Sequence, residues 1–195
     1  NNQSLTSINC TYNNLTSLDL SKNTSLSNVT NAMIGNQSVS LKANFDGNMI
    51  VIPFENSNLD NDNYVSSTLD DYGDGSGFNF ESFIAYDVSE IDGGIEYYCN
   101  TKLAGSENMK VSVTVSRDFH QVSFYADSEN TSLIGRAFAN DGQSVTAPEI
   151  KNPPQCKVLD TWSDTLDNVT GDKSIYANWK DAHSYSLSSF SNDTA

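Results

Sequence analysis

Apolar and polar residues alternate along the middle of the chain, between about residues 37 and 117. Successive side chains of a strand point to opposite faces of a sheet, so this period of two predicts half-buried strands. The predicted strands cover residues 38–42, 48–54, 78–84, 95–99 and 109–115. Asp46-Gly47-Asn48 predicts a hairpin turn between the first two strands, and the polar, acidic residues 55–77 predict a loop. Short strands separated by turns are typical of a β-sandwich, and we expect an Ig-like one.

A further β-rich region follows the boundary at residues 117–120. Its apolar runs occupy residues 121–125, 133–134, 158–159 and 175–179, and residues 148–154 form a Pro-containing loop. Residues 181–195 are Ser-rich, which is typical of a linker. The expected fold class is therefore mainly β. The expected division of the chain is 1–36, 37–117, 118–180 and 181–195.

The N-terminal region repeats itself with a period of 21 residues. Its first copy reads Leu5-x-x-Ile8-x-Cys10-x-x-Asn13-x-Leu15, and a second copy begins at Leu26 and decays. This pattern resembles the leucine-rich repeat, whose unit is a short strand, a turn and a connector. The resemblance implies that the apolar positions face a shared core and that the Asn bonds turn backbone. One repeat cannot bury its own apolar face. We therefore expect residues 1–36 to be the end of an array in a longer or processed protein. Either further repeats precede it, or it docks on the next domain.

The third region resembles the Listeria–Bacteroides repeat, the B-repeat of internalin-like surface proteins. The resemblance covers residues 121–180 and rests on Val122-x-Phe124, Asp127, Leu133, Gly142-x-x-Val145, Pro148, Trp162, Asp172 and Ala177-x-Trp179. It implies a small β-grasp-like module. The family usually has Tyr-x-Phe-x-Gly-Trp before its Trp, whereas residues 157–162 here read KVLDTW. The alternative is that the Trp residues are ordinary anchors of a β core.

The order of the three regions is similar to that in bacterial leucine-rich-repeat surface proteins of internalin-like or BspA-like type. The resemblance implies an extracellular, non-enzymatic adhesion segment that connects a repeat array to spacer modules. The array would bind a protein or glycan ligand. Two alternatives stay open. One is a calcium-assisted module that itself binds a glycan or protein, and the other is an accessory region of a secreted hydrolase.

The formal net charge is −15, from 25 acidic and 10 basic residues. Nucleic acids and anionic membranes attract basic surfaces, so neither is an expected partner. No apolar run reaches transmembrane length, so no membrane insertion is expected. The three cysteines, Cys10, Cys99 and Cys156, are widely spaced and form no zinc-binding pattern, and we expect them to be reduced and structural.

An acidic, Gly-rich stretch is the candidate metal site. Set beside the calcium-loop pattern, it places Asp70 at position one, Asp74 at five, Gly75 at six and Glu81 at twelve. Carboxylate oxygens and a Gly at the sharp turn suit calcium, but Tyr72 breaks the third position and no helices flank the loop. Further ligands could come from Asp60, Asp62 and Asp71. The competing interpretation is a solvated loop, and no other cofactor is expected.

Exposed aromatic residues are the remaining candidates for binding. Tyr72, Tyr97 and Tyr98 lie in or near the acidic region and could stack on sugars or enter partner pockets. Tyr97 and Tyr98 are adjacent on a predicted strand, so one is expected to face the core and the other solvent. Neither histidine, His120 nor His183, lies beside a nucleophile motif, and no phosphate loop or dinucleotide motif occurs. We therefore expect no enzyme activity.

Overall fold

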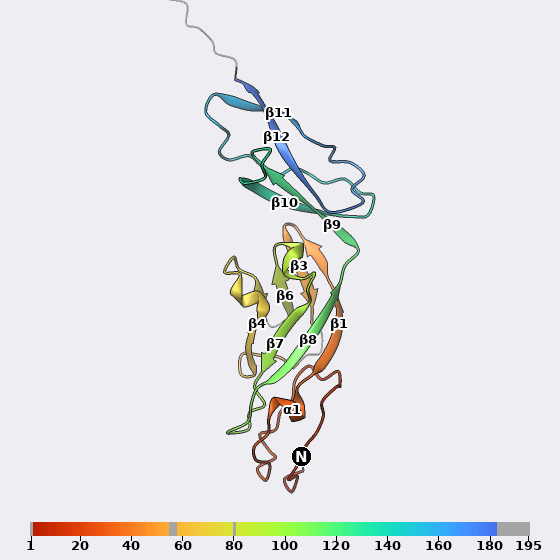
Figure 1. Ribbon diagram of the computed structural model, residues 1–195, viewed down its shortest axis with the longest axis vertical. Helices are drawn as coiled ribbons and strands as arrows, with labels where there is room; N and C mark the ends of the chain where they lie inside the picture. The colour runs from red at the N-terminus through yellow and green to blue at the C-terminus, as the bar shows by residue number, and fades with distance from the viewer. Residues whose placement is uncertain (1, 55–57, 80, 183–195) are drawn as a thin grey trace, which may run out of the picture. The chain divides into compact units, whose positions relative to one another are not determined.

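The computed structural model describes residues 2–54, 58–79 and 81–182, which form two compact units divided between Gln121 and Val122 (Figure 1). The chain is mainly β, which confirms the expected fold class. The first unit holds two four-stranded sheets and the second holds one. Most of the Ser-rich tail, residues 183–195, lies outside the described residues.

The first unit is built as a β-sandwich. One sheet has the order β1-β8-β7-β4. Its strands are β1 (Gln37–Lys42), β8 (Met109–Ser116), β7 (Ile95–Cys99) and β4 (Tyr64–Ser67). The other sheet has the order β2-β3-β6-β5. Its strands are β2 (Asn44–Asp46), β3 (Met49–Pro53), β6 (Ser82–Ala85) and β5 (Gly77–Phe78). β1 and β8 run parallel, and the other neighbouring strands are antiparallel.

Aromatic rings from both sheets meet in the core of the sandwich. The ring of Phe54, which follows β3, lies 5.4 Å from that of Phe83 in β6 and 5.5 Å from that of Tyr97 in β7. These three side chains are at most 3% exposed. Burying a large apolar side chain contributes about 1.5–3 kcal/mol, and a well-oriented ring pair adds about 0.5–1.5 kcal/mol. The inward-facing side chains of both sheets thus pack into one shared core.

The predicted hairpin between residues 38–42 and 48–54 is wrong in its first strand. The turn at Gly47 and Asn48 joins β2 to β3, whereas β1 pairs in parallel with β8 in the other sheet. The chain changes sheets at Ala43, which is fully buried and whose N–H donates to the carbonyl of Ser116. A small side chain allows this close approach at the crossing. The alternation of polar and apolar residues gave no sign of the change of sheet.

The acidic stretch at residues 55–77 is not simply a loop, and the strand expected at 78–84 is two strands. The stretch contains β4, the 3-10 helix η1 (Thr68–Asp71) and the start of β5. β4 is an edge strand of four residues, and it is too short and too polar to show a clear alternation of apolar and polar residues. Between β5 and β6, Ser82 N–H donates to Asn79 Oδ1 at 3.0 Å.

Residues 2–36 belong to the first unit. We call residues 2–22 and 23–36 the first and second coil, because Asn2 and Asn23 lie one 21-residue period apart. Asn23 Nδ2 donates to the carbonyl of Asn2, one 21-residue period earlier, at 2.7 Å. Asn13 Nδ2 donates to the carbonyls of Cys10 and Thr11, the turn-bonding role that the repeat resemblance assigns to this Asn. The only regular element in residues 2–36 is α1 (Asn31–Ile34), so the strand implied by the repeat is not formed. Cys10 N–H donates to the carbonyl of Met33 at 2.8 Å. Met33 belongs to α1, so the backbone partner of Cys10 is a helical turn and not an extended strand.

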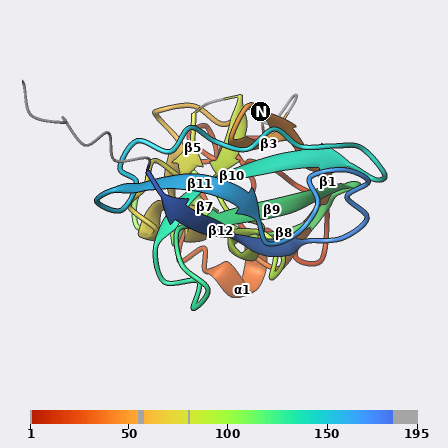
Figure 2. The ribbon, with the colours of Figure 1, turned by 90° about the horizontal axis from the view of Figure 1, so that it is seen from above.

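The second unit consists of one sheet with the order β10-β9-β12-β11, whose strands lie side by side in Figure 2. Its strands are β9 (Phe119–Tyr125), β10 (Leu133–Asn140), β11 (Lys157–Trp162) and β12 (Lys173–Asp181). β9 and β12 pair in parallel with Phe124 opposite Ile175, and β11 pairs antiparallel to β12. The core of this unit contains Val122, Phe124, Ala139, Val145, Val169 and Ile175.

Candidate functional site: two anchor regions of the sandwich

Gln37, the first residue of β1, joins the N-terminal coils to the sandwich. Its side chain is 1% exposed. Its Nε2 donates to the carbonyls of Cys10 and Ile34, both at 2.7 Å, and its Oε1 accepts from Leu15 N–H at 3.1 Å. One side-chain amide therefore satisfies backbone groups of the first coil and of α1 at once. Buried backbone groups need such partners, because leaving one unpaired costs about 1–3 kcal/mol.

β7 and the loop after it provide further contacts to the coils. The hydroxyl of Tyr97 donates to the carbonyl of Thr16 at 2.7 Å, and Leu20 N–H donates to the carbonyl of Thr101 at 2.8 Å. Burial raises the pKa of Tyr97 well above its usual range, so the hydroxyl stays a neutral donor. Burial also raises the pKa of Cys99, at the end of β7, to about 11. This thiol is thus an inert core group, as expected from the sequence.

A third contact lies where α1 meets the start of β8. Asn31 N–H donates to Glu107 Oε2 at 2.5 Å, and Lys110 N–H donates to Asn31 Oδ1 at 3.2 Å. Glu107 N–H in turn donates to the carbonyl of Val29 at 3.0 Å. We call the four sandwich residues Gln37, Tyr97, Thr101 and Glu107 the coil anchor. They tie three parts of the N-terminal region to separate positions on one sheet and its loops.

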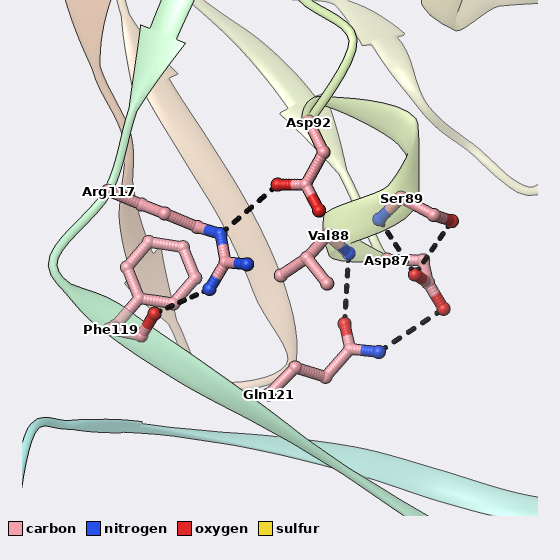
Figure 3. A network of polar contacts seen from close by, with 7 residues as sticks. All are labelled: Asp87, Val88, Ser89, Asp92, Arg117, Phe119 and Gln121. Atoms are coloured by element: carbon pink, nitrogen blue, oxygen red, sulfur yellow. Dashed lines mark hydrogen bonds and ion pairs between the residues drawn. The ribbon is translucent and has the colours of Figure 1, made fainter. Parts of the chain in front are cut away.

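A second polar network holds the segment that leads to the end of the first unit (Figure 3). Gln121 is 6% exposed; its Oε1 accepts from Val88 N–H at 3.0 Å and its Nε2 donates to Asp87 Oδ2 at 3.3 Å. Val88 begins the 3-10 helix η2 (Val88–Glu90), whose N-cap is Asp87. The side-chain amide of Gln121 thus pairs with the start of η2.

Arg117 completes this network at the end of β8. Its Nη1 donates to the carbonyl of Phe119 at 2.7 Å, and its Nε lies 3.4 Å from Asp92 Oδ1 (Figure 3). The guanidinium also lies over the Phe119 ring, 5.7 Å from its centroid, while that ring packs at 5.4 Å against Phe45 of β2. We call Arg117 and Gln121 the linker anchor. It fixes residues 117–121 against both η2 and the second sheet of the sandwich.

The first calcium candidate, Asp70, acts as a capping residue in this structure. Its Oδ2 accepts from the hydroxyl of Tyr64 and from Ser67 N–H, both at 2.7 Å. The Ser67 side chain caps η1 in return, forming a capping box. The Asp70 carboxylate thereby joins β4 to η1. This local structural role accounts for an acidic residue here without a metal ion.

The other two calcium candidates do not join Asp70 in a set of ligands. Asp74 Oδ1 accepts from Ser76 N–H at 2.9 Å, and Ser76 Oγ lies 2.6 Å from Asp74 Oδ1 and 2.7 Å from Glu90 Oε2. Glu81 is exposed, and its backbone N–H donates to Asn79 Oδ1. Within residues 2–54, 58–79 and 81–182, no group of three or more His, Cys, Asp or Glu side chains is placed to hold a metal ion. Asp74 pairs through Ser76 with Glu90, a residue that the motif does not include.

The three candidate binding tyrosines occupy different environments. Tyr72, the C-cap of η1, is 51% exposed and remains available to a partner. Tyr98 is half-buried on β7. Tyr97 is fully buried between the sheets, so the prediction that its ring binds a partner is wrong. The alternation of β7 turns adjacent side chains to opposite faces, and the inward face of this strand lies in the core.

The anchor residues were not identified from the sequence, although one signal was present. Gln37 precedes Val39 and Leu41 by two and four positions, so the period of β1 places all three on one face. A Gln on an inward face requires buried partners, which could have marked it. Gln121 and Arg117 carry no comparable signal, because their partners in η2 and the following turn are at least 25 residues away.

In the part of the chain that the structure describes, no helix is both long and apolar enough to cross a membrane. No protein-family model, curated protein or solved structure matches this chain.

Proposed function

We propose that this chain is a non-enzymatic, extracellular segment of a bacterial surface protein involved in adhesion. In this proposal the sandwich is a connector between a leucine-rich-repeat array, which binds a protein or glycan, and a β-grasp-like spacer module. The observation that carries it is the pair of anchors. The sandwich fixes the incoming coils through Gln37 and the outgoing segment through Gln121, each by a buried side-chain amide.

The coil contacts support the repeat part of the proposal. Asn2 and Asn23 lie one period apart and are bonded, which is the contact expected between equivalent positions of stacked coils. Leu20, Leu26 and Val29 are at most 6% exposed. Leu5 and Ile8, two apolar positions of the first repeat copy, are only part-buried, which suits a further coil of the same kind.

Contacts in the second unit support the spacer part. The Trp162 ring packs edge-on against Phe124 at 5.0 Å, and Trp179 Nε1 donates to the carbonyl of Ala126 at 2.8 Å. Two aromatic positions on which the B-repeat resemblance rests thus contribute to one small core and its edge. Generic anchoring of a β core would use Trp in the same way, so these contacts support a spacer of either origin.

Hydrogen exchange tests the connector. If the coils are fixed to the sandwich, the amides of Cys10 and Leu20 should open only with the sandwich core, at a free energy close to that of the Val111 amide. A loosely attached segment would exchange near the rate of an unstructured chain, and this result would refute the connector. Surface location has a separate test. Antibodies against this chain should label intact source cells, and labelling only after permeabilisation would refute that part.

A further inference from the structure

We infer that the first unit carries a binding cleft for a neutral carbohydrate, at the level of one or two sugar units. The cleft has a volume of about 420 Å³, within the range of about 300–1,000 Å³ that is usual for small-molecule sites. Three segments that are far apart in the sequence line it. They contribute Ser17, Leu18, Asp19, Asn58, Asp60, Asn63, Asn100 and Lys102. Residues 17–19 belong to the N-terminal coils, so this site rests on the attachment of the coils in the proposed function.

The chemistry of the lining selects the class of ligand. Apart from Leu18, every lining side chain carries a hydrogen-bonding group, so the cleft does not suit an apolar ligand. Two carboxylates and one ammonium group leave it with a formal charge of −1, which disfavours anions. Carboxylates accept hydrogen bonds, ammonium groups donate them, and amides do both. Sugar hydroxyl groups also donate and accept, so this mixture of groups suits a polyhydroxylated ligand.

The two carboxylates are already oriented by their own turns. Asp60 Oδ1 accepts from Asp62 N–H at 2.9 Å and from Asn63 N–H at 3.1 Å, and Asp19 Oδ1 accepts from Ser21 N–H at 2.8 Å. In both carboxylates these hydrogen bonds fix the neighbouring backbone and hold the group in place. Hydrogen bonds from Ser21, and the nearby charge of Lys102, lower the pKa of Asp19. It therefore stays an acceptor at neutral pH.

Each wall is also held by a buried residue beside the polar ones. Leu20 follows Asp19, Leu59 lies between Asn58 and Asp60, and Thr101 lies between Asn100 and Lys102; these three are at most 5% exposed. The walls are bonded to one another as well, because Leu20 N–H donates to Thr101 O and Asn100 N–H donates to Asn63 O. A preformed site loses less conformational entropy when it binds a ligand.

Binding can be tested by two-dimensional NMR on the whole chain with millimolar disaccharides as probes. The probes cover the gluco, galacto, manno and N-acetylated configurations. At least one should shift the backbone signals of Asp60, Asn63 and Lys102. Asp60→Asn should weaken that binding about tenfold, since it removes a charged acceptor but keeps the Oδ1 that fixes the turn. Asp62→Asn is the matched control, because it removes the same charge from the same loop outside the cleft lining, and it should bind like the wild type.

Three results would overturn the carbohydrate site. The first is the absence of shifts with every probe, and the second is shifts that map away from the cleft. The third is equal weakening by Asp60→Asn and Asp62→Asn, which would indicate a general effect of charge on the loop. Wild-type backbone signals in both variants, recorded without sugar, confirm that a loss of binding is not a loss of folding. None of these results affects the hydrogen-exchange test of the connector.

Discussion

Replacing Gln37 by leucine removes the central hydrogen bonds of the coil anchor while keeping a side chain of similar size. The carbonyl of Cys10 keeps a donor, because Asn13 Nδ2 also bonds it at 2.9 Å. The buried carbonyls of Ile34 and Gly35 lose the donor that Gln37 supplies, and the part-buried Leu15 N–H loses its acceptor. Each buried polar group left unpaired costs about 1–3 kcal/mol, so the variant should lose roughly 2–6 kcal/mol of stability in the coils. That is a large part of the ~5–15 kcal/mol by which a typical domain is stable.

The location of this loss distinguishes it from a general weakening of the protein. Hydrogen exchange followed by mass spectrometry should show faster exchange in peptides covering residues 8–20 of Gln37→Leu. Both tryptophans, Trp162 and Trp179, lie in the second unit. Urea unfolding followed by tryptophan fluorescence should therefore be unchanged. Gln143→Leu, at an exposed position of the second unit, makes the same chemical change as a control and should leave residues 8–20 unaffected. Wild-type exchange of these peptides in Gln37→Leu would refute the reasoning.

Three further predictions concern the same unit. In thermal unfolding, Gly94→Ala should lower the stability by about 2–3 kcal/mol. Gly94 has φ +81°, and a Cβ there would lie 2.7 Å from the carbonyl oxygen of Val113. The control Gly93→Ala should cost far less, because Gly93 has no positive φ and open space around a Cβ. Burial raises the pKa of Cys99 from 9.0 to about 11, so its stabilising contribution is complete below pH 9 and is lost as the pH rises to 11. In urea titrations over this range, wild type should lose on the order of 2 kcal/mol more than Cys99→Ala, and equal losses would contradict this. Calcium should leave the melting temperature equal to that in chelator, because the Asp70 carboxylate already accepts two hydrogen bonds, and a calcium-dependent rise would instead establish a metal site.

The acidic stretch has the spacing of a calcium-binding loop, but its carboxylates have other roles in the structure. Asp70, Asp74 and Glu81 have the spacing of calcium ligands, yet the structure uses Asp70 to cap η1 and pairs Asp74 through Ser76 with Glu90. Carboxylates accept hydrogen bonds from turn backbone as readily as they bind cations, so spacing alone does not separate the two uses. The partner that distinguishes them, Glu90, lies outside the motif.

The sequence by itself determined the local features of this protein. The period of two located β1, β3, β7 and β8, and the resemblance to the leucine-rich repeat predicted that Asn13 bonds a turn. Both features depend on neighbours within a few positions. Only the tertiary structure decided that β1 pairs with β8, that Gln37 and Gln121 are anchors, and that three distant segments form one polar cleft. These outcomes depend on which backbone groups remain unpaired once both sheets have packed. That condition is set by residues that chain order keeps far apart, so the local pattern places Gln37 on an inward face but does not identify its partners.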